Sequence, residues 1–144
     1  QEKAIERGDL VHSIMAHIKT PDDVAFALNH FLNSGIINAA QNEELENLVN
    51  RIINHEQLRQ YFDDSNTIYN EKDIISTKGK LFRPDRVVVD INNQATIIDY
   101  KTGLQDSKHE EQLFDYQYIL EEMSFKVIKK ILIYINDEIV IKEF

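Results

Sequence analysis

The sequence contains no cysteine, no long apolar run, no low-complexity tract and no excess of basic side chains. Without cysteine there are no disulfide bonds and no thiolate metal sites, so a bound metal would need oxygen or imidazole ligands. No apolar run approaches the roughly 18–20 residues that cross a bilayer, and we expect no membrane partner. Sixteen basic against 25 acidic side chains give a formal charge of −9. This charge argues against a generic nucleic-acid-binding module, because such proteins are usually basic.

What the sequence does contain is typical of one globular domain. It has 144 residues, of which 42% are hydrophobic and 28% are charged, and a chain of this size can bury a core. We expect residues 1–144 to form a single domain. The chain starts at Gln1 and not at methionine, which suggests a piece excised from a longer polypeptide, with a trimmed product as the alternative. The lack of cysteine fits a reducing cytoplasm.

The first sixty residues read as helical. Apolar residues recur at helical spacing from Leu10 to Ile18, with Asp9 as the expected N-cap. Thr20 and Pro21 signal a second helix, which the pair Ser34-Gly35 ends. A third helix is expected at about 42–54, followed by a short turn or helix at 55–61.

The character of the sequence changes after residue 65. Segments 66–78, 80–91 and 94–101 are rich in β-branched and aromatic residues and are separated by turn signals, which predicts three consecutive antiparallel strands. A helix is expected at 107–123, and further strands at 127–135 and 138–143. This order predicts an α/β fold, in which helices flank a mixed sheet and the N-terminal third is helical.

The segment 94–101 carries the most suggestive chemistry. Because side chains alternate along a strand, Asp99 and Lys101 share one face, about 7 Å apart. Asp85 lies in the preceding strand after Pro84, and a proline there makes the strand start late or bulge. Two aspartates and a lysine suit phosphodiester hydrolysis, since carboxylates hold Mg²⁺ or Mn²⁺ and an ammonium stabilises negative charge. For Asp99 and Lys101 alone, a pair of surface charges at a strand end is the alternative.

Several further motifs accompany these residues, in order along the chain. They are Glu6-Arg7-Gly8-Asp9-Leu10-Val11-His12, Asn70-Glu71, Arg83-Pro84-Asp85-Arg86, Ile97-Ile98-Asp99-Tyr100-Lys101-Thr102-Gly103, and Gln112 with Tyr116 four residues later. The set resembles the PD-(D/E)XK nuclease superfamily. It looks most like the RecB-type nuclease domain at the C-terminus of exodeoxyribonuclease V beta subunits and AddA-like helicase-nucleases. The resemblance implies a restriction-endonuclease-like fold. Some relatives hold an iron–sulfur cluster through four cysteines, which this chain cannot do.

The resemblance also implies roles for individual residues. His12, Asp85, Asp99 and the backbone carbonyl of Tyr100 would coordinate the metal. The catalytic set would be Asp85, Asp99, Lys101 and Glu71, with Lys101 orienting the attacking water. Gln112 and Tyr116 would contact DNA, and Lys108, one turn before Gln112, is our own candidate phosphate contact.

Each of these assignments has a plain structural alternative. His12 could be a solvated or capping residue, Glu71 could belong to a solvated charge run, and Tyr116 could simply lie at the edge of the core. His109 lacks any motif, and we read it as structural or exposed.

The function that these features favour is a Mg²⁺-dependent exonuclease or endonuclease domain acting in recombinational repair or DNA end processing. Its partners would be single- or double-stranded DNA ends, helicase domains of the same polypeptide and a partner subunit, in the bacterial cytoplasm near the nucleoid. A catalytically silent DNA-binding or scaffolding module with the same fold is the runner-up. A metal-dependent hydrolase of another phosphoester is a third possibility.

Overall fold

The computed structural model describes residues 2–144, with side chains described from residue 7 onward. Glu6 of the first motif therefore lies outside the described side chains. The chain divides into two compact units, one ending at Asp64 and the other running from Ser65 to Phe144. Across residues 2–144, none of the helices has both the length and the apolar character needed to cross a bilayer.

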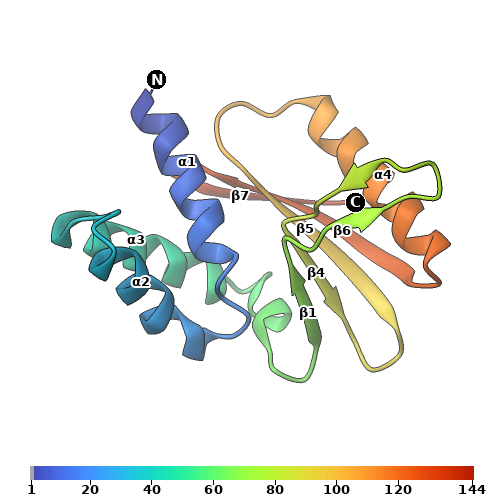
Figure 1. Ribbon diagram of the computed structural model, residues 1–144, viewed down its shortest axis with the longest axis horizontal. Coiled ribbons are helices and arrows are strands. Elements are labelled where there is room, and N and C mark those ends of the chain that lie inside the picture. The colour runs from blue at the N-terminus through green and yellow to red at the C-terminus, as the bar shows by residue number, and fades with distance from the viewer. Residues whose placement is uncertain (1) are drawn as a thin grey trace. The chain divides into compact units, whose positions relative to one another are not determined.

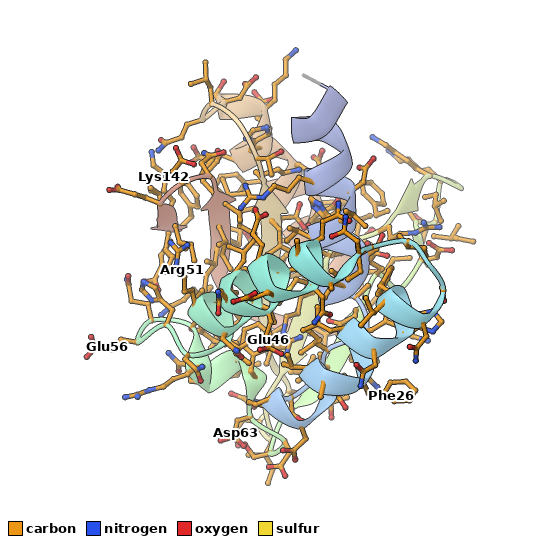
Figure 2. The ribbon with its side chains drawn as sticks, turned by 90° about the vertical axis from the view of Figure 1, so that its left-hand side faces the viewer. Phe26, Glu46, Arg51, Glu56, Asp63 and Lys142 are labelled. Atoms are coloured by element: carbon orange, nitrogen blue, oxygen red, sulfur yellow. The ribbon has the colours of Figure 1, made fainter. Side chains whose placement is uncertain are left out.

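The first unit is helical, as the sequence predicts. Its elements are α1 (Glu2–Met15), η1 (Pro21–Asp23), α2 (Val24–Asn33), α3 (Ala39–Ile53) and η2 (Arg59–Phe62). Thr20 and Asp23 form a capping box before α2, and Asn38 and Gln41 form another at α3, which satisfies helix N–H groups that have no intrahelical partner. Figure 2 shows Phe26 projecting from α2 into solvent, where 77% of it is exposed.

One expectation for this unit was wrong. Asp9 was expected to cap the first helix, but α1 runs from Glu2 through Asp9 to Met15. The apolar stripe that marked the helix begins at Leu10, so periodicity located only the later part of α1 and missed the turns before it. A polar first turn carries no stripe, and periodicity alone cannot detect it.

The second unit is a mixed sheet with one helix. Its elements are β1 (Thr67–Asn70), β2 (Ile74–Ile75), β3 (Leu81–Phe82), β4 (Arg86–Val89), β5 (Gln94–Lys101), α4 (Ser107–Glu122), β6 (Lys126–Ile135) and β7 (Ile139–Glu143). The five main strands lie in the order β1-β4-β5-β6-β7. Only β5 and β6 are parallel, and α4 makes the crossover between them (Figure 1). The predicted fold class, α/β with a mixed sheet and a helical N-terminal third, is confirmed.

The first two predicted strands are each broken in two. The segment 66–78 divides into β1 and β2, and the segment 80–91 divides into β3 and β4. Pro84 lacks the N–H that a continuous ladder needs, and Glu71 has a left-handed φ of 49°, which turns the chain out of the sheet. As a result β2 and β3 form a separate hairpin, and β4 starts late, at Arg86, as the proline suggested.

The face of the sheet beneath α4 holds the core that positions the site. Buried side chains of β4, β5 and β6 pack there against Leu113, Tyr116 and Leu120 of α4. Ile74 and Phe82 of the hairpin pack against the edge of the same cluster. Burial of this apolar surface fixes the helix over the ends of β4 and β5.

Candidate active site

Asp85, the residue just before β4, lies directly opposite Asp99 of β5. The antiparallel register pairs Arg86 with Ile98, and one further step along it brings Asp85 to Asp99. There the backbone N–H of Asp85 donates to Asp99 Oδ1 at 3.0 Å, and the N–H of Tyr100 donates to Asp85 Oδ2 at 2.8 Å. The two carboxylates thus accept the hydrogen bonds that fasten the neighbouring strands together.

Such a pairing has an electrostatic cost that the surroundings reduce. Asp99 is only 2% exposed, and like charges opposite each other in a sheet are destabilising. Hydrogen bonds from backbone N–H groups stabilise a carboxylate in its charged form. Lys101 Nζ, 3.7 Å from Asp99 Oδ2, adds a positive charge. That distance is an ion pair but is too long for a tight hydrogen bond, as the strand spacing led us to expect.

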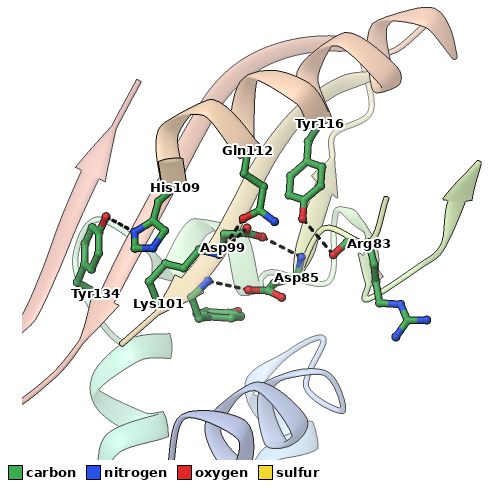
Figure 3. A network of polar contacts seen from close by, with 9 residues as sticks. Arg83, Asp85, Asp99, Lys101, His109, Gln112, Tyr116 and Tyr134 are labelled. Atoms are coloured by element: carbon green, nitrogen blue, oxygen red, sulfur yellow. Dashed lines mark hydrogen bonds and ion pairs between the residues drawn. The ribbon is translucent and has the colours of Figure 1, made fainter. Parts of the chain in front are cut away.

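Lys101 is held from the other side by α4. Its Nζ donates to Gln112 Oε1 at 2.8 Å, a short, charge-assisted hydrogen bond (Figure 3). An ammonium has three donors, so the Gln112 and Asp99 contacts leave at least one N–H of Lys101 for another acceptor. Gln112 is therefore the residue that places the lysine above the two carboxylates.

Tyr116 closes the side of the site that faces the hairpin. It is 5% exposed, and burial raises the pKa of its hydroxyl above the ordinary value, so this group stays protonated. The hydroxyl donates to the carbonyl of Arg83 at 3.4 Å (Figure 3). Tyr116 thereby connects α4 to the backbone two residues before Asp85, and the structural alternative, a buried tyrosine at the edge of the core, describes its position.

The backbone of Glu71 is hydrogen-bonded to that of Asp85. Its N–H donates to the carbonyl of Asp85 at 3.1 Å, and it follows directly after the last residue of β1. The strand glutamate of the sequence motif is thus at a kink beside the site and outside the strand itself. Arg83, from the same motif as Asp85, forms an exposed ion pair with Asp73 at 2.6 Å.

His109 is a neighbour of the site that the sequence reasoning missed. Its Nδ1 lies 2.8 Å from the Tyr134 hydroxyl of β6, and Tyr134 is paired in register with Lys101. Partial burial lowers the pKa of His109, and the positive charge of Lys101 lowers it further. The signal that could have identified it is spacing, since His109 precedes Gln112 by three positions and shares its helix face.

The loop between β5 and α4 is anchored at both ends. Asn136, in the turn between β6 and β7, accepts from the Gly103 N–H at 2.9 Å and donates to the Gly103 carbonyl at 3.0 Å. Asp106 caps α4 by accepting from the Lys108 N–H at 2.9 Å. The side chain of Lys108, the proposed phosphate contact, is exposed in the first turn of this helix.

His12 belongs to the helical unit that ends at Asp64. It is partly buried in α1, and its Nδ1 lies 2.9 Å from the carbonyl oxygen of Gly8, one turn earlier. This contact is within the helix, and it orients the imidazole ring along α1.

The donor set near Asp85 suits a hard divalent cation. Within the part of the chain that the structure describes, no cluster of three or more His, Asp or Glu side chains is arranged to hold a metal. The side-chain ligands available at this point are the two carboxylates of Asp85 and Asp99, supplemented by backbone carbonyls and water. Mg²⁺ is commonly bound by one or two carboxylates together with waters and substrate phosphates, so this set fits the ion.

Known proteins place these features in context. The family model described as "PD-(D/E)XK nuclease superfamily" matches residues 1–143. No curated protein matches the chain at a significant level. Among solved structures, the chain is similar to one described as "Crystal structure of SSO0001", with 21% sequence identity and a TM-score of 0.35, over 81% of this chain and 54% of that chain. The chain thus spans about half the length of that protein.

Proposed function

The chain belongs to the PD-(D/E)XK nuclease superfamily, and from this premise we propose that it is a metal-dependent deoxyribonuclease domain that hydrolyses DNA phosphodiester bonds. The observation that carries the proposal is the meeting of Asp85, Asp99 and Lys101 at one point, with Lys101 held by Gln112. A surface pair of strand-end charges would not include a buried carboxylate such as Asp99 and would not be fixed by four separate contacts.

Asp85, Asp99 and the backbone carbonyl of Tyr100 are the proposed metal ligands, with His12 as a fourth on the basis of the family resemblance. Bound there, Mg²⁺ or Mn²⁺ would polarise a phosphate oxygen and lower the pKa of a water. Asp99 is buried and Asp85 is only partly exposed, so their carboxylates compete with little bulk water. Both are fixed by backbone N–H donors before substrate arrives, which reduces the reorganisation needed for the reaction.

Lys101 is the proposed positioning and charge-stabilising group. Its remaining N–H can donate to the attacking water or to a non-bridging phosphate oxygen. The negative charge on the phosphate oxygens rises as the new P–O bond forms, so a fixed ammonium stabilises the transition state more than the ground state. Glu71, beside the Asp85 carbonyl, is proposed to support the metal or its waters.

Gln112, Tyr116 and Lys108 are the proposed DNA-facing residues of α4. Gln112 has an amide group whose oxygen binds Lys101 and whose nitrogen can donate to DNA. Lys108 is exposed one turn earlier on the same helix face. Tyr116 serves mainly as a buttress, since its hydroxyl donates to the Arg83 carbonyl.

The RecB-type motif supports a narrower proposal about biological context. We place the domain in a helicase-nuclease that processes DNA ends during recombinational repair in the bacterial cytoplasm, with a partner subunit. A helicase that feeds the strand would also explain how a chain of charge −9 acts on a polyanion. This context can be tested separately from the chemistry. If it is right, the larger polypeptide proposed to contain this domain should copurify with an ATP-dependent DNA-unwinding activity.

The central test is cleavage of linear single- and double-stranded DNA with Mg²⁺, Mn²⁺ or EDTA. We expect metal-dependent cleavage by the wild type, and a loss of at least about a hundredfold in Asp99→Asn and Lys101→Gln. Asn at position 99 keeps an oxygen for the Asp85 N–H, so the fold is preserved while the charge is removed.

Matched controls are Glu122→Gln on α4 and Lys142→Gln on β7, which make the same charge changes at exposed positions. Both should cleave like the wild type. If all variants cleave equally, the activity belongs to a contaminant. If the full-length polypeptide binds DNA without metal and never cleaves it, the result would favour the catalytically silent scaffolding module instead.

A further inference from the structure

The strands β2 and β3 form a two-stranded hairpin that is separate from the five-stranded sheet of the second unit. Ile74 pairs with Phe82 and Ile75 with Leu81, and the hairpin leaves the sheet at the end of β1 and returns just before Asp85. Figure 1 shows it lying beside α4. Ile74 and Phe82 face the core cluster, so one side of the hairpin is anchored by apolar contacts.

Its turn is tightly defined. The N–H of Ser76 donates to the Lys80 carbonyl at 2.8 Å, and the N–H of Gly79 donates to the Ser76 carbonyl at 2.9 Å. The N–H of Lys80 donates to Ser76 Oγ at 3.1 Å. Gly79 has a φ of 81°, which a glycine adopts without strain. The turn therefore presents Lys78 and Lys80 on either side of Gly79 from a fixed backbone.

The charge of this hairpin is opposite to that of the chain. Between Glu71 and Pro84 there are four basic and two acidic side chains, whereas the whole chain carries −9. Arg83 and Asp73 neutralise each other at 2.6 Å. Among the side chains that the structure describes, those of residues 7–144, neither Lys78 nor Lys80 forms an ion pair with a carboxylate. The turn is thus a local positive site in an acidic protein.

A cavity joins this turn to the candidate active site. It has a volume of about 410 Å³ and is lined by Lys80, Leu81, Phe82, Arg83, Gln112, Asp115 and Tyr116. Gln112 on its wall is the residue that binds Lys101. Lys80 Nζ lies 5.1 Å from the Phe82 ring centre, and Phe82 packs edge-on against Tyr116 at 6.2 Å between centroids. The lysine is therefore held at the mouth of the cavity.

We propose that the β2–β3 hairpin is a DNA-binding arm, in which Lys78 and Lys80 bind phosphates that neighbour the one being cut on the same DNA strand. The cavity between the hairpin and α4 accommodates the adjoining nucleotide. Ligand pockets measure roughly 300–1,000 Å³, so the volume is adequate. Asp115 is the one acidic group in the wall, and it disfavours a phosphate deep inside, which leaves the phosphates of the strand to Lys80 in the cavity wall and to Lys78 in the adjoining turn. This inference rests on the proposed function.

Binding measured without catalysis tests it. The affinity of the full chain for a fluorescein-labelled single-stranded oligodeoxynucleotide is determined in EDTA by anisotropy, over about 50–200 mM salt. In the double variant Lys78→Gln with Lys80→Gln, we expect about tenfold weaker binding at the lowest salt. The slope of log affinity against log salt should fall by about 1.4, since each lost phosphate contact removes roughly 0.7 for a single strand.

Two further variants separate this role from general effects. Lys142→Gln removes one positive charge of the same kind from β7, at the opposite edge of the sheet from β1, where Figure 2 shows the side chain projecting outward, and should bind like the wild type. Lys78→Arg with Lys80→Arg should retain both affinity and slope. An unchanged slope in the glutamine double variant, or an equal loss in Lys142→Gln, would overturn the proposal.

Phosphodiester hydrolysis is measured independently of the hairpin with bis(4-nitrophenyl) phosphate and Mn²⁺. This small substrate has no neighbouring phosphates for Lys78 and Lys80 to bind. Wild type and the lysine double variant should hydrolyse it at the same rate. Lack of hydrolysis by the wild type would count against the proposed function, whereas the hairpin is judged by the EDTA binding data.

Discussion

At the scale of single residues, the site depends on the position of Lys101. This side chain is held by two acceptors of different character, a neutral amide at 2.8 Å and a carboxylate at 3.7 Å. If the amide were removed, electrostatic attraction would draw the ammonium toward Asp99, because the closer acceptor would be gone. A displacement of about 1 Å at a reacting centre can cost a hundredfold in rate.

We therefore expect Gln112→Leu to reduce kcat for DNA cleavage by about tenfold to a hundredfold. The thermal midpoint should change little, because Gln112 is at the edge of the core and its hydrocarbon stem is retained. KM should rise to a smaller extent than kcat falls, because the proposed contact between the amide and DNA is lost as well. Gln112→Glu restores an acceptor oxygen and should recover much of the rate. Steady-state kinetics with calorimetry checks both, and a change confined to KM would show that Gln112 acts only in substrate binding.

The residues of the site were easier to predict from the sequence than any other part of the molecule. Asp85, Asp99 and Lys101 stood out through motif and spacing, and the structure brings them together with Gln112 and Tyr116. The hydrogen bonds between the carboxylates and the opposite backbone could not be foreseen, because they depend on the strand register. The link from His109 to Tyr134 was missed because a residue in β6 supplies the partner.

At the scale of the elements, α4 is the part that assembles the site, since it supplies both Gln112 and Tyr116. Its start is fixed by Asp106, which accepts from the Lys108 N–H at 2.9 Å. A carboxylate there also interacts favourably with the positive end of the helix dipole. The loop that leads into it is tied to the β6–β7 turn by Asn136.

Replacing this cap gives a test of the element. Asp106→Ala should lower the free energy of unfolding by about 1 kcal/mol, the usual cost of losing an N-cap. Asp106→Asn keeps the acceptor and should lose only the smaller contribution of the charge, about 0.3–1 kcal/mol. Urea denaturation of the three proteins measures the difference. Equal stability of the alanine variant and the wild type would mean that the loop, and not the cap, sets the start of α4.

The elements themselves were predicted unevenly. The helix at 107–123 and the strands at 127–135 and 138–143 correspond closely to α4, β6 and β7, because their apolar runs are bounded by clear turn residues. The segments 66–78 and 80–91 were each predicted as one strand, since their composition favours strands throughout, and only the second was expected to start late or bulge, at Pro84. Pro84 and the left-handed Glu71 break them, and these local geometries outweigh composition.

At the scale of the whole molecule, the acidic charge and the proposed cation are connected. A ligand that binds the folded state alone raises stability by RT ln(1 + [L]/Kd), about 2.7 kcal/mol at a hundred times Kd. Two buried or partly buried carboxylates that repel each other provide the driving force for such binding.

We therefore expect Mg²⁺ to raise the thermal midpoint of the wild type by several degrees relative to EDTA. NaCl at equal ionic strength serves as the control. Asp99→Asn should abolish the rise, and His12→Ala should reduce it, since His12 is a proposed ligand. Calorimetry is the suitable measurement, because it resolves two transitions if the two units melt separately. A full Mg²⁺ response in His12→Ala would remove this histidine from the ligand set.

The reciprocal bonds between Asp85, Asp99 and the facing backbone have a consequence for how this chain could change over evolutionary time. Each aspartate fastens two strands, so selection for folding alone would retain both in a descendant that had stopped cutting DNA. Lys101 is 22% exposed at its side chain and supports no backbone group, so drift would replace it first. Among related sequences, the lysine is therefore the better marker of a working nuclease, and the aspartates are the better marker of shared ancestry.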